Sequence, residues 1–168
     1  MIGVIPNPKK NIVIDKDINS IKESISLISL LHPKYKTTSS DDMLKQYTFE
    51  ATELLSLGVY IDINITSLEE DKTDVSVEIR RKIGSFDKSH EVTNANGKIQ
   101  KVFELISKGL QMSEDDVAQL KESRKVEKVQ LTEKQGKNVE TNKKILKVFG
   151  IILLLLIVGA IVSKFFLK

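Results

Sequence analysis

The chain has 168 residues, 40% of them apolar and 29% charged, a length that suits one domain and an appendage. It has no cysteine, which excludes disulfides, thiolate metal sites and a cysteine nucleophile. Its two histidines exclude a histidine-rich metal cluster. A net charge of +3, 5% aromatic residues and no tryptophan argue against nucleic acid as a partner.

Two elements open the part that we expect to fold, residues 1–110, where fifteen basic residues nearly balance sixteen acidic ones. The β-branched run at 11–15 predicts a strand. Asp17 is a suitable N-cap for a helix from 17 to about 31, along which isoleucines recur at helical spacing. Pro33 ends this helix, because proline disfavours helical geometry in the residue before it.

Strand signals follow in series. Residues 34–38 are a short candidate strand, and the polar run from Ser39 to Asp42 predicts a turn. Apolar and polar residues then alternate in three further segments, which predicts half-buried antiparallel strands. These three segments are 44–53, 59–66 and 75–80. After an irregular stretch, apolar residues at helical spacing predict a helix over 95–110, with Gly109 as a C-cap.

The expected fold is therefore α+β: an antiparallel meander in the order β-α-β-β-β-β-α, with one face covered by two helices. The phases of these elements place Ile25 and Ile63 in the core on facing elements, and Ser24 in solvent. In element order, residues 10–110 resemble a reduced helix-grip domain of the START/Bet v 1-like family. The resemblance implies a C-terminal helix lying across the sheet, and the family's members enclose a deep ligand cavity. The chain has fewer strands than the family pattern, and no functional residue carries over.

Catalytic motifs are missing from the sequence. It contains no G-x-S-x-G elbow, no phosphate-binding G-x-x-x-x-G-K-[ST] loop and no G-x-G-x-x-G turn. The acidic clusters lack the spacing of a calcium loop. We expect no enzyme activity, no metal and no cofactor. Arg81 is one candidate anion contact, because alternation places it on the inward face at a strand end, where its fork suits phosphate or carboxylate; alternatively it reaches solvent.

Residues 111–144 form a charged linker, expected to be partly helical and partly flexible. Ser113 followed by three acidic residues is a helix-start signal. The pattern then dissolves into alternating charge without a sustained heptad, so a coiled coil is not predicted.

The segment 145–168 predicts a C-terminal transmembrane helix. Residues 148–162 carry no charge, and the span 145–167 would measure about 34 Å as a helix, enough to cross a hydrocarbon core of about 30 Å. The predicted anchor residues are Val148, Ile151, Leu154, Ile157 and Ile161.

Lysines flank this segment and predict its orientation. Five lie upstream between 134 and 147 and two lie downstream, which places the N-terminal domain in the cytoplasm. Those expected to set topology or meet lipid headgroups are Lys143, Lys144, Lys147 and Lys164.

These features together predict a single-pass, tail-anchored membrane protein that presents a cytoplasmic binding or assembly module. Its expected partners are membrane lipid and a protein in the same membrane, as for an accessory subunit of a membrane complex. One alternative is a membrane-tethered module for a lipid or other apolar ligand. A second is a membrane-tethered enzyme with an unrecognised site.

Overall fold

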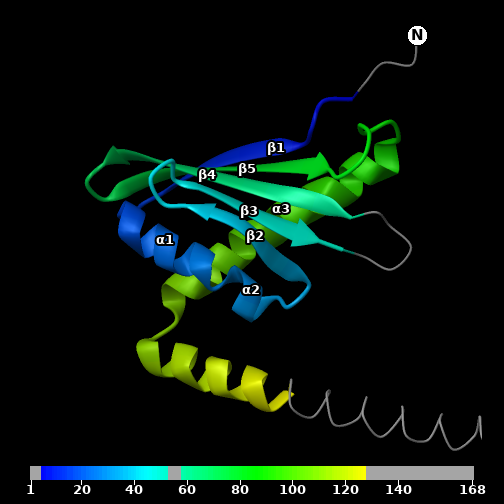
Figure 1. Cartoon of the computed structure of the whole chain (residues 1–168). Helices are drawn as coiled ribbons and strands as arrows, with labels where there is room; N and C mark the ends of the chain where they lie inside the picture. The colour runs from blue at the N-terminus through cyan, green and yellow to red at the C-terminus, as the bar shows by residue number, and fades with distance from the viewer. Residues whose placement is uncertain (1–4, 53–57, 128–168) are drawn as a thin grey trace, which may run out of the picture. The chain divides into compact units, whose positions relative to one another are not determined.

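The computed structural model describes residues 5–52 and 58–127 (Figure 1). The elements are β1 (Lys9–Ile14), α1 (Ile18–Ser26), α2 (Ile28–Leu31), β2 (Tyr35–Asp41), β3 (Gln46–Ala51), β4 (Val59–Glu69), β5 (Lys72–Arg81) and α3 (Ser89–Gln111). The α+β class and the order of the strands confirm the prediction. By its contacts the chain divides into two compact units, residues 1–118 and 119–168, of which the second is described only over 119–127.

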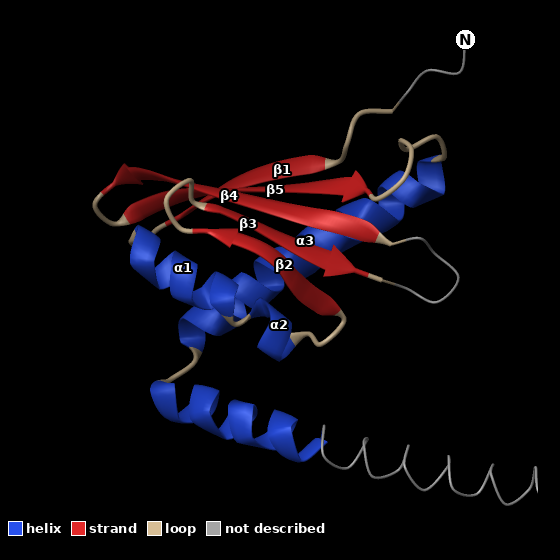
Figure 2. Cartoon of the chain, in the orientation of Figure 1, coloured by secondary structure: helices blue, strands red, loops and turns tan. Residues whose placement is uncertain are grey.

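The five strands form one antiparallel sheet in the order β1-β5-β4-β3-β2, so the first and last strands of the chain are neighbours. Figure 2 shows the helices α1, α2 and α3 gathered on one side of this sheet. The pairing register aligns Tyr47 of β3, Ile63 of β4 and Val77 of β5 across the sheet. Because side chains alternate along a strand, this register gives the sheet one apolar face, which the helices cover.

The core lies between that face and the helices. Ile63 and Val77 have no exposed surface, and neither have Ile25 of α1 and Val102 of α3. The burial of Ile25 and Ile63 confirms their prediction as core residues. The opposite face of the sheet is polar, and there Arg80 donates to Asp62 at 2.8 Å.

The first predicted helix is two helices, α1 and α2, which meet at Leu27. The Leu27 amide donates to the Ser24 carbonyl and the Leu30 amide to the Leu27 carbonyl, so the junction is tightened by bonds three residues apart. In α1 the hydroxyls of Ser24 and Ser26 donate to carbonyls three residues back. Side-chain bonds of this kind bend helices. The sequence periodicity did not reveal this break, because Ile25 and Ile28 are both buried on either side of it.

The predictions for Ser24 and Gly109 are wrong. Ser24 is 1% exposed, and Gly109 is a buried residue within α3 rather than its cap. A Cβ built on Gly109 would lie 2.9 Å from the Cβ of Ser24. These two small residues therefore allow α1 and α3 to touch, a contact between elements that periodicity along one helix cannot indicate.

The predicted turn at Ser39 to Asp42 begins later. Ser39 and Ser40 continue β2, and the turn is built around Asp41, whose Oδ1 accepts from the amides of Met43 and Leu44 at 2.9 and 2.8 Å. Lys45 closes the turn with a positive φ of 55°. Serines and aspartates serve both edge strands and turns, so composition alone placed the turn too early.

Asp17 caps α1 as predicted, accepting from the amides of Asn19 and Ser20. The Ser20 hydroxyl, the largest influence, and the Ser20 amide hold the pKa of Asp17 below its ordinary value.

A carboxyl with a lowered pKa, such as that of Asp17, stabilises the fold above its unfolded pKa, and that contribution is lost as the pH falls through the folded pKa. We expect Asp17→Ala to lower the melting temperature at neutral pH, and the difference from the native chain to shrink well below about pH 4. Thermal unfolding followed by circular dichroism measures both; a pH-independent difference would contradict the capping account.

A further helix follows α3, covering 114–127 in the described part of the chain. Ser113 and Asp116 cap it reciprocally: the Asp116 amide donates to Ser113 Oγ at 3.2 Å, and the Ser113 amide donates to Asp116 Oδ2 at 3.0 Å. The helix start predicted at Ser113 is thus confirmed. Within 5–52 and 58–127, no helix combines the length and the apolar character needed to cross a membrane.

Candidate functional site

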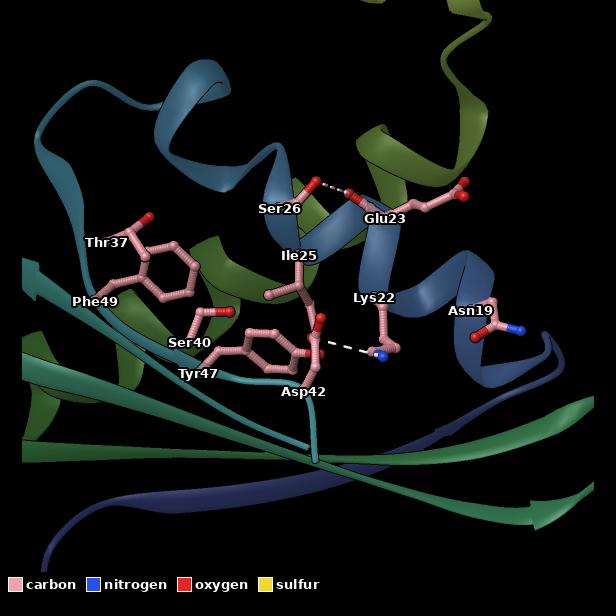
Figure 3. Close-up of a pocket in the computed structure, with 10 residues that line it drawn as sticks. All are labelled: Asn19, Lys22, Glu23, Ile25, Ser26, Thr37, Ser40, Asp42, Tyr47 and Phe49. Atoms are coloured by element: carbon pink, nitrogen blue, oxygen red, sulfur yellow. Dashed lines mark hydrogen bonds and ion pairs between the residues drawn. The ribbon is translucent and has the colours of Figure 1, made fainter. Parts of the chain in front are cut away.

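A groove lies between α1 and the β2–β3 hairpin, at the margin of the core (Figure 3). Its volume is about 500 Å³, within the range of small-molecule sites. We call it the α1–β3 groove. The side chains that line it are Asn19, Lys22, Glu23, Ile25, Ser26, Thr37, Ser40, Asp42, Tyr47 and Phe49.

The apolar lining of the groove comes from Ile25, Tyr47 and Phe49. Tyr47 and Phe49 lie two residues apart on β3 and therefore share the face that turns toward the helices. All three are at least 95% buried, with exposures of 0, 5 and 2%. They are members of the core that back one side of the groove, and only the edges of Tyr47 and Phe49 reach it.

Charged groups lie around this apolar surface. Lys22 Nζ is 3.5 Å from Asp42 Oδ1, an ion pair that links α1 to the β2–β3 turn. Glu23 follows Lys22 on the helix, so the groove is bordered by one cation and two anions. Asp42 is largely exposed, with 73% of its side chain open to solvent, whereas Lys22 is 27% exposed. A ligand group that carries both signs could contact this border, because cation and anion are both accessible.

Tyr47 links the apolar lining of the groove to its charged border. Its hydroxyl donates to Asp42 Oδ1 at 2.8 Å. Burial of the ring and this hydrogen bond to a carboxylate raise the pKa of Tyr47 well above its ordinary value. The phenol stays protonated across the physiological range and holds the β2–β3 turn through Asp42.

Groups suited to metal binding are not assembled here. Within the described residues, no three His, Asp or Glu side chains are placed to hold a metal ion. Of the two carboxylates at the border of the groove, Asp42 is engaged by Lys22 and Tyr47.

Arg81, the predicted anion contact, lies at the end of β5 next to the start of α3. Its Nη1 donates to the Ser85 carbonyl at 3.0 Å and to Glu91 Oε2 at 3.2 Å, and it lies 3.7 Å from Asp87 Oδ1. The anions in contact with this guanidinium are carboxylates of the same domain, which tie β5 and the following loop to α3. The predicted anchor residues and Lys143, Lys144, Lys147 and Lys164 lie outside the described residues.

A second, more open hollow lies between β1 and α3 and has a volume of about 670 Å³. Ile12 of β1 and Phe103 of α3 contribute its apolar surface. Polar and charged side chains complete it: Lys10, Gln100, Glu104, Ser107, Lys108 and Gln111.

No protein-family profile and no curated protein matches the chain. Among solved structures it is similar to a START superfamily protein from Mycobacterium smegmatis, at 11% identity and a TM-score of 0.45, with 61% of this chain and 94% of that one covered. It is also similar to Ara h 8.0201, a Bet v 1-like protein, at 12% identity and a TM-score of 0.39, with 64% and 98% covered. These neighbours match the helix-grip resemblance, and at such values the likeness concerns the fold outline alone.

Sequence reasoning did not find the α1–β3 groove. Alternation placed Tyr47 and Phe49 on an inward face, and helical phase did the same for Ile25. Neither pattern tells how closely α1 approaches β2 and β3. One signal was present: a tyrosine at an inward strand position needs a hydrogen-bond partner, and Asp42 in the adjacent turn supplies it.

Proposed function

We propose that the chain is a membrane-tethered, non-catalytic binding module that holds a small amphipathic molecule in the α1–β3 groove. The ligand class that fits is a single-chain lipid with a zwitterionic headgroup. Its apolar part would enter the groove beside Tyr47 and Phe49, and its headgroup would meet Lys22 and Asp42.

One observation carries this proposal: a groove of about 500 Å³ lies between the edges of core side chains and an accessible pair of opposite charges. Ligand sites in proteins combine an apolar lining with a few placed polar groups. The central part of the sheet is closed to a ligand, since Ile61, Ile63, Val75, Val77 and Ile79 are covered by the helices. A ligand at the margin of the core would displace solvent rather than packed side chains.

Native mass spectrometry of the full chain, extracted from membranes in a mild detergent, tests this proposal. We expect a stoichiometric lipid adduct on the native chain and loss of the adduct from Ser40→Trp, because an indole there would occupy the groove. Thr66→Trp, at an exposed position of β4 outside the groove, is the matched control and should retain the adduct. Equal adducts on all three chains, or none on the native chain, would overturn the proposal.

The same proposal includes a membrane anchor formed by residues 145–168, and this part of it rests on the sequence. The uncharged run and the lysine asymmetry support a span with the N-terminal domain in the cytoplasm. Deletion of 145–168 should release the chain into the supernatant after ultracentrifugation, whereas the full chain should stay in the membrane pellet after carbonate extraction. Carbonate release of the full chain would contradict the span.

An accessory-subunit role is the second candidate, and the apolar loop tips favour it. Met43 and Leu44 of the β2–β3 turn are 91 and 66% exposed, and Leu68 near the β4–β5 turn is 54% exposed. Both turns lie at the same end of the sheet, because the Ile65 amide donates to the Lys45 carbonyl. Exposed apolar groups that gather at one end are typical of protein contacts. In a native-membrane pull-down, Met43→Ser with Leu44→Ser should lose a stoichiometric protein partner that the native chain retains.

A further inference from the structure

Strand β1 lies at an edge of the sheet (Figure 1). It pairs with β5 over six residues in continuous register, without a bulge. The other edge strand, β2, has a register shift between Thr37 and Ser39. A bulge of this kind protects an edge strand against pairing with other chains, whereas exposed lysines occur on both edges and do not distinguish them. Of the two edges, β1 is therefore the one open to strand addition.

The hydrogen-bonding groups of β1 that face away from the sheet can be assigned. The Ile79 amide donates to the Pro8 carbonyl at 2.9 Å, so Pro8 faces β5. In an antiparallel ladder this direction alternates, so residues 10, 12 and 14 also bond toward β5. The amides and carbonyls of Lys9, Asn11 and Val13 consequently point outward. All three residues are exposed, and Val13 is 56% exposed despite being apolar.

The hollow between β1 and α3 lies beside this edge. Its apolar surface comes from Ile12 and Phe103. A strand added to β1 would direct every second side chain to the helix-bearing face of the sheet, over these two residues. Main-chain bonds along an edge, combined with a hollow for alternate side chains, are the ordinary form of β-augmentation.

Charge along β1 identifies the strand that fits. Lys9 and Lys10 occupy its first half, where Glu78 of β5 pairs with Lys9, so this half keeps a net positive charge. At its end Asp15 and Asp74, the latter paired with Val13, outnumber Lys16. An antiparallel second β1 brings the basic half of each strand beside the acidic end of the other. A parallel copy would set lysine beside lysine.

We propose that two copies of the chain associate through β1, antiparallel about a two-fold axis at Asn11. Lys9 of each copy then pairs with Val13 of the other, and the two Asn11 residues face each other. The outward groups of residues 9, 11 and 13 satisfy one another, and the two sheets become continuous. Such an interface is isologous and closes on itself.

Cysteine cross-linking of the full chain in native membrane vesicles tests this arrangement, because the chain contains no cysteine of its own. Directly opposed residues in a hydrogen-bonded pair lie about 5.5 Å apart at Cα, within the range that a disulfide spans. Asn11→Cys should therefore form a covalent dimer under mild oxidation. Val13 of one copy lies opposite Lys9 of the other, so the two Val13 positions are about 13 Å apart along the strands and Val13→Cys should not cross-link.

Ser39→Cys, on the exposed edge strand β2, is the control: its cross-linking measures how often two chains form a disulfide through random collision. Light scattering of the native chain in detergent should give the mass of two copies, and Asn11→Pro should reduce it to one, because it removes an outward amide while residues 10 and 12 still bond to β5. A native mass of one copy would overturn the proposal. So would cross-linking of Asn11→Cys no greater than that of Ser39→Cys or Val13→Cys, since a partner of another kind or another register would then occupy the edge.

Discussion

Ile25→Asp should unfold the domain or bring it close to unfolding. Ile25 has no exposed surface and lies among the isoleucines that join α1 to the sheet. Loss of its buried apolar atoms costs about 2–5 kcal/mol. An unpaired carboxyl buried in its place adds roughly 1–3 kcal/mol. The sum is comparable to the total stability of a small domain, about 5–15 kcal/mol. Urea unfolding of the full chain in a mild detergent, followed by circular dichroism, measures the loss.

Ser26→Asp is the matched control for Ile25→Asp. Ser26 is the next residue of α1 and is exposed, so the same carboxyl there stays in water and should change the unfolding free energy by less than about 1 kcal/mol. Equal losses from Ile25→Asp and Ser26→Asp would mean that the burial of α1 is misplaced. Ser24 cannot serve as the control, because it is buried against α3.

Gly109→Ala should destabilise the domain although alanine is the better helix former. The new Cβ would lie 2.9 Å from Ser24 Cβ and 3.0 Å from Ser24 Cα, so α1 and α3 would have to move apart. Overpacking of this kind costs about 1–3 kcal/mol. The gain in helix propensity, about 1 kcal/mol, offsets only part of it. A net loss of up to about 2 kcal/mol in urea unfolding is expected.

Gly97→Ala provides the control in the same helix. A Cβ at Gly97 meets no atom within 4 Å, so only the gain in helix propensity remains. This variant should stabilise the domain by about 0.5–1 kcal/mol. The two substitutions are chemically identical and differ in environment alone, and opposite signs are therefore expected. Stabilisation by both would mean that α1 and α3 do not touch at Gly109.

Sequence patterns predicted the sheet well because each strand buries one face. Alternation at Tyr47, Phe49, Ile61, Ile63, Val75 and Val77 is a direct record of that burial. The caps at Asp17 and Ser113 were equally readable, since they depend on neighbours three residues away. Patterns within one element therefore predicted the strands and helices and which of their faces are buried.

Contacts between elements were less accessible to such rules. Ser24 was expected in solvent from its phase along the helix, yet it faces α3, and its small size is what allows Gly109 to approach. Likewise, the α1–β3 groove depends on the distance between α1 and the β2–β3 hairpin, which no pattern within either element encodes. The order of the sheet, with β1 beside β5, is also a property of the whole chain.

Hydrogen exchange measured by mass spectrometry tests most directly whether the α1–β3 groove holds the ligand. The full chain in lipid nanodiscs is compared with and without added lysophosphatidylcholine, a zwitterionic single-chain lipid. The proposed site predicts slower exchange in peptides that cover residues 18–26 and 35–51, and unchanged exchange in residues 89–111. Protection of α3 and β5 with no change in α1, or no protection anywhere in the domain, would contradict a binding site in this groove.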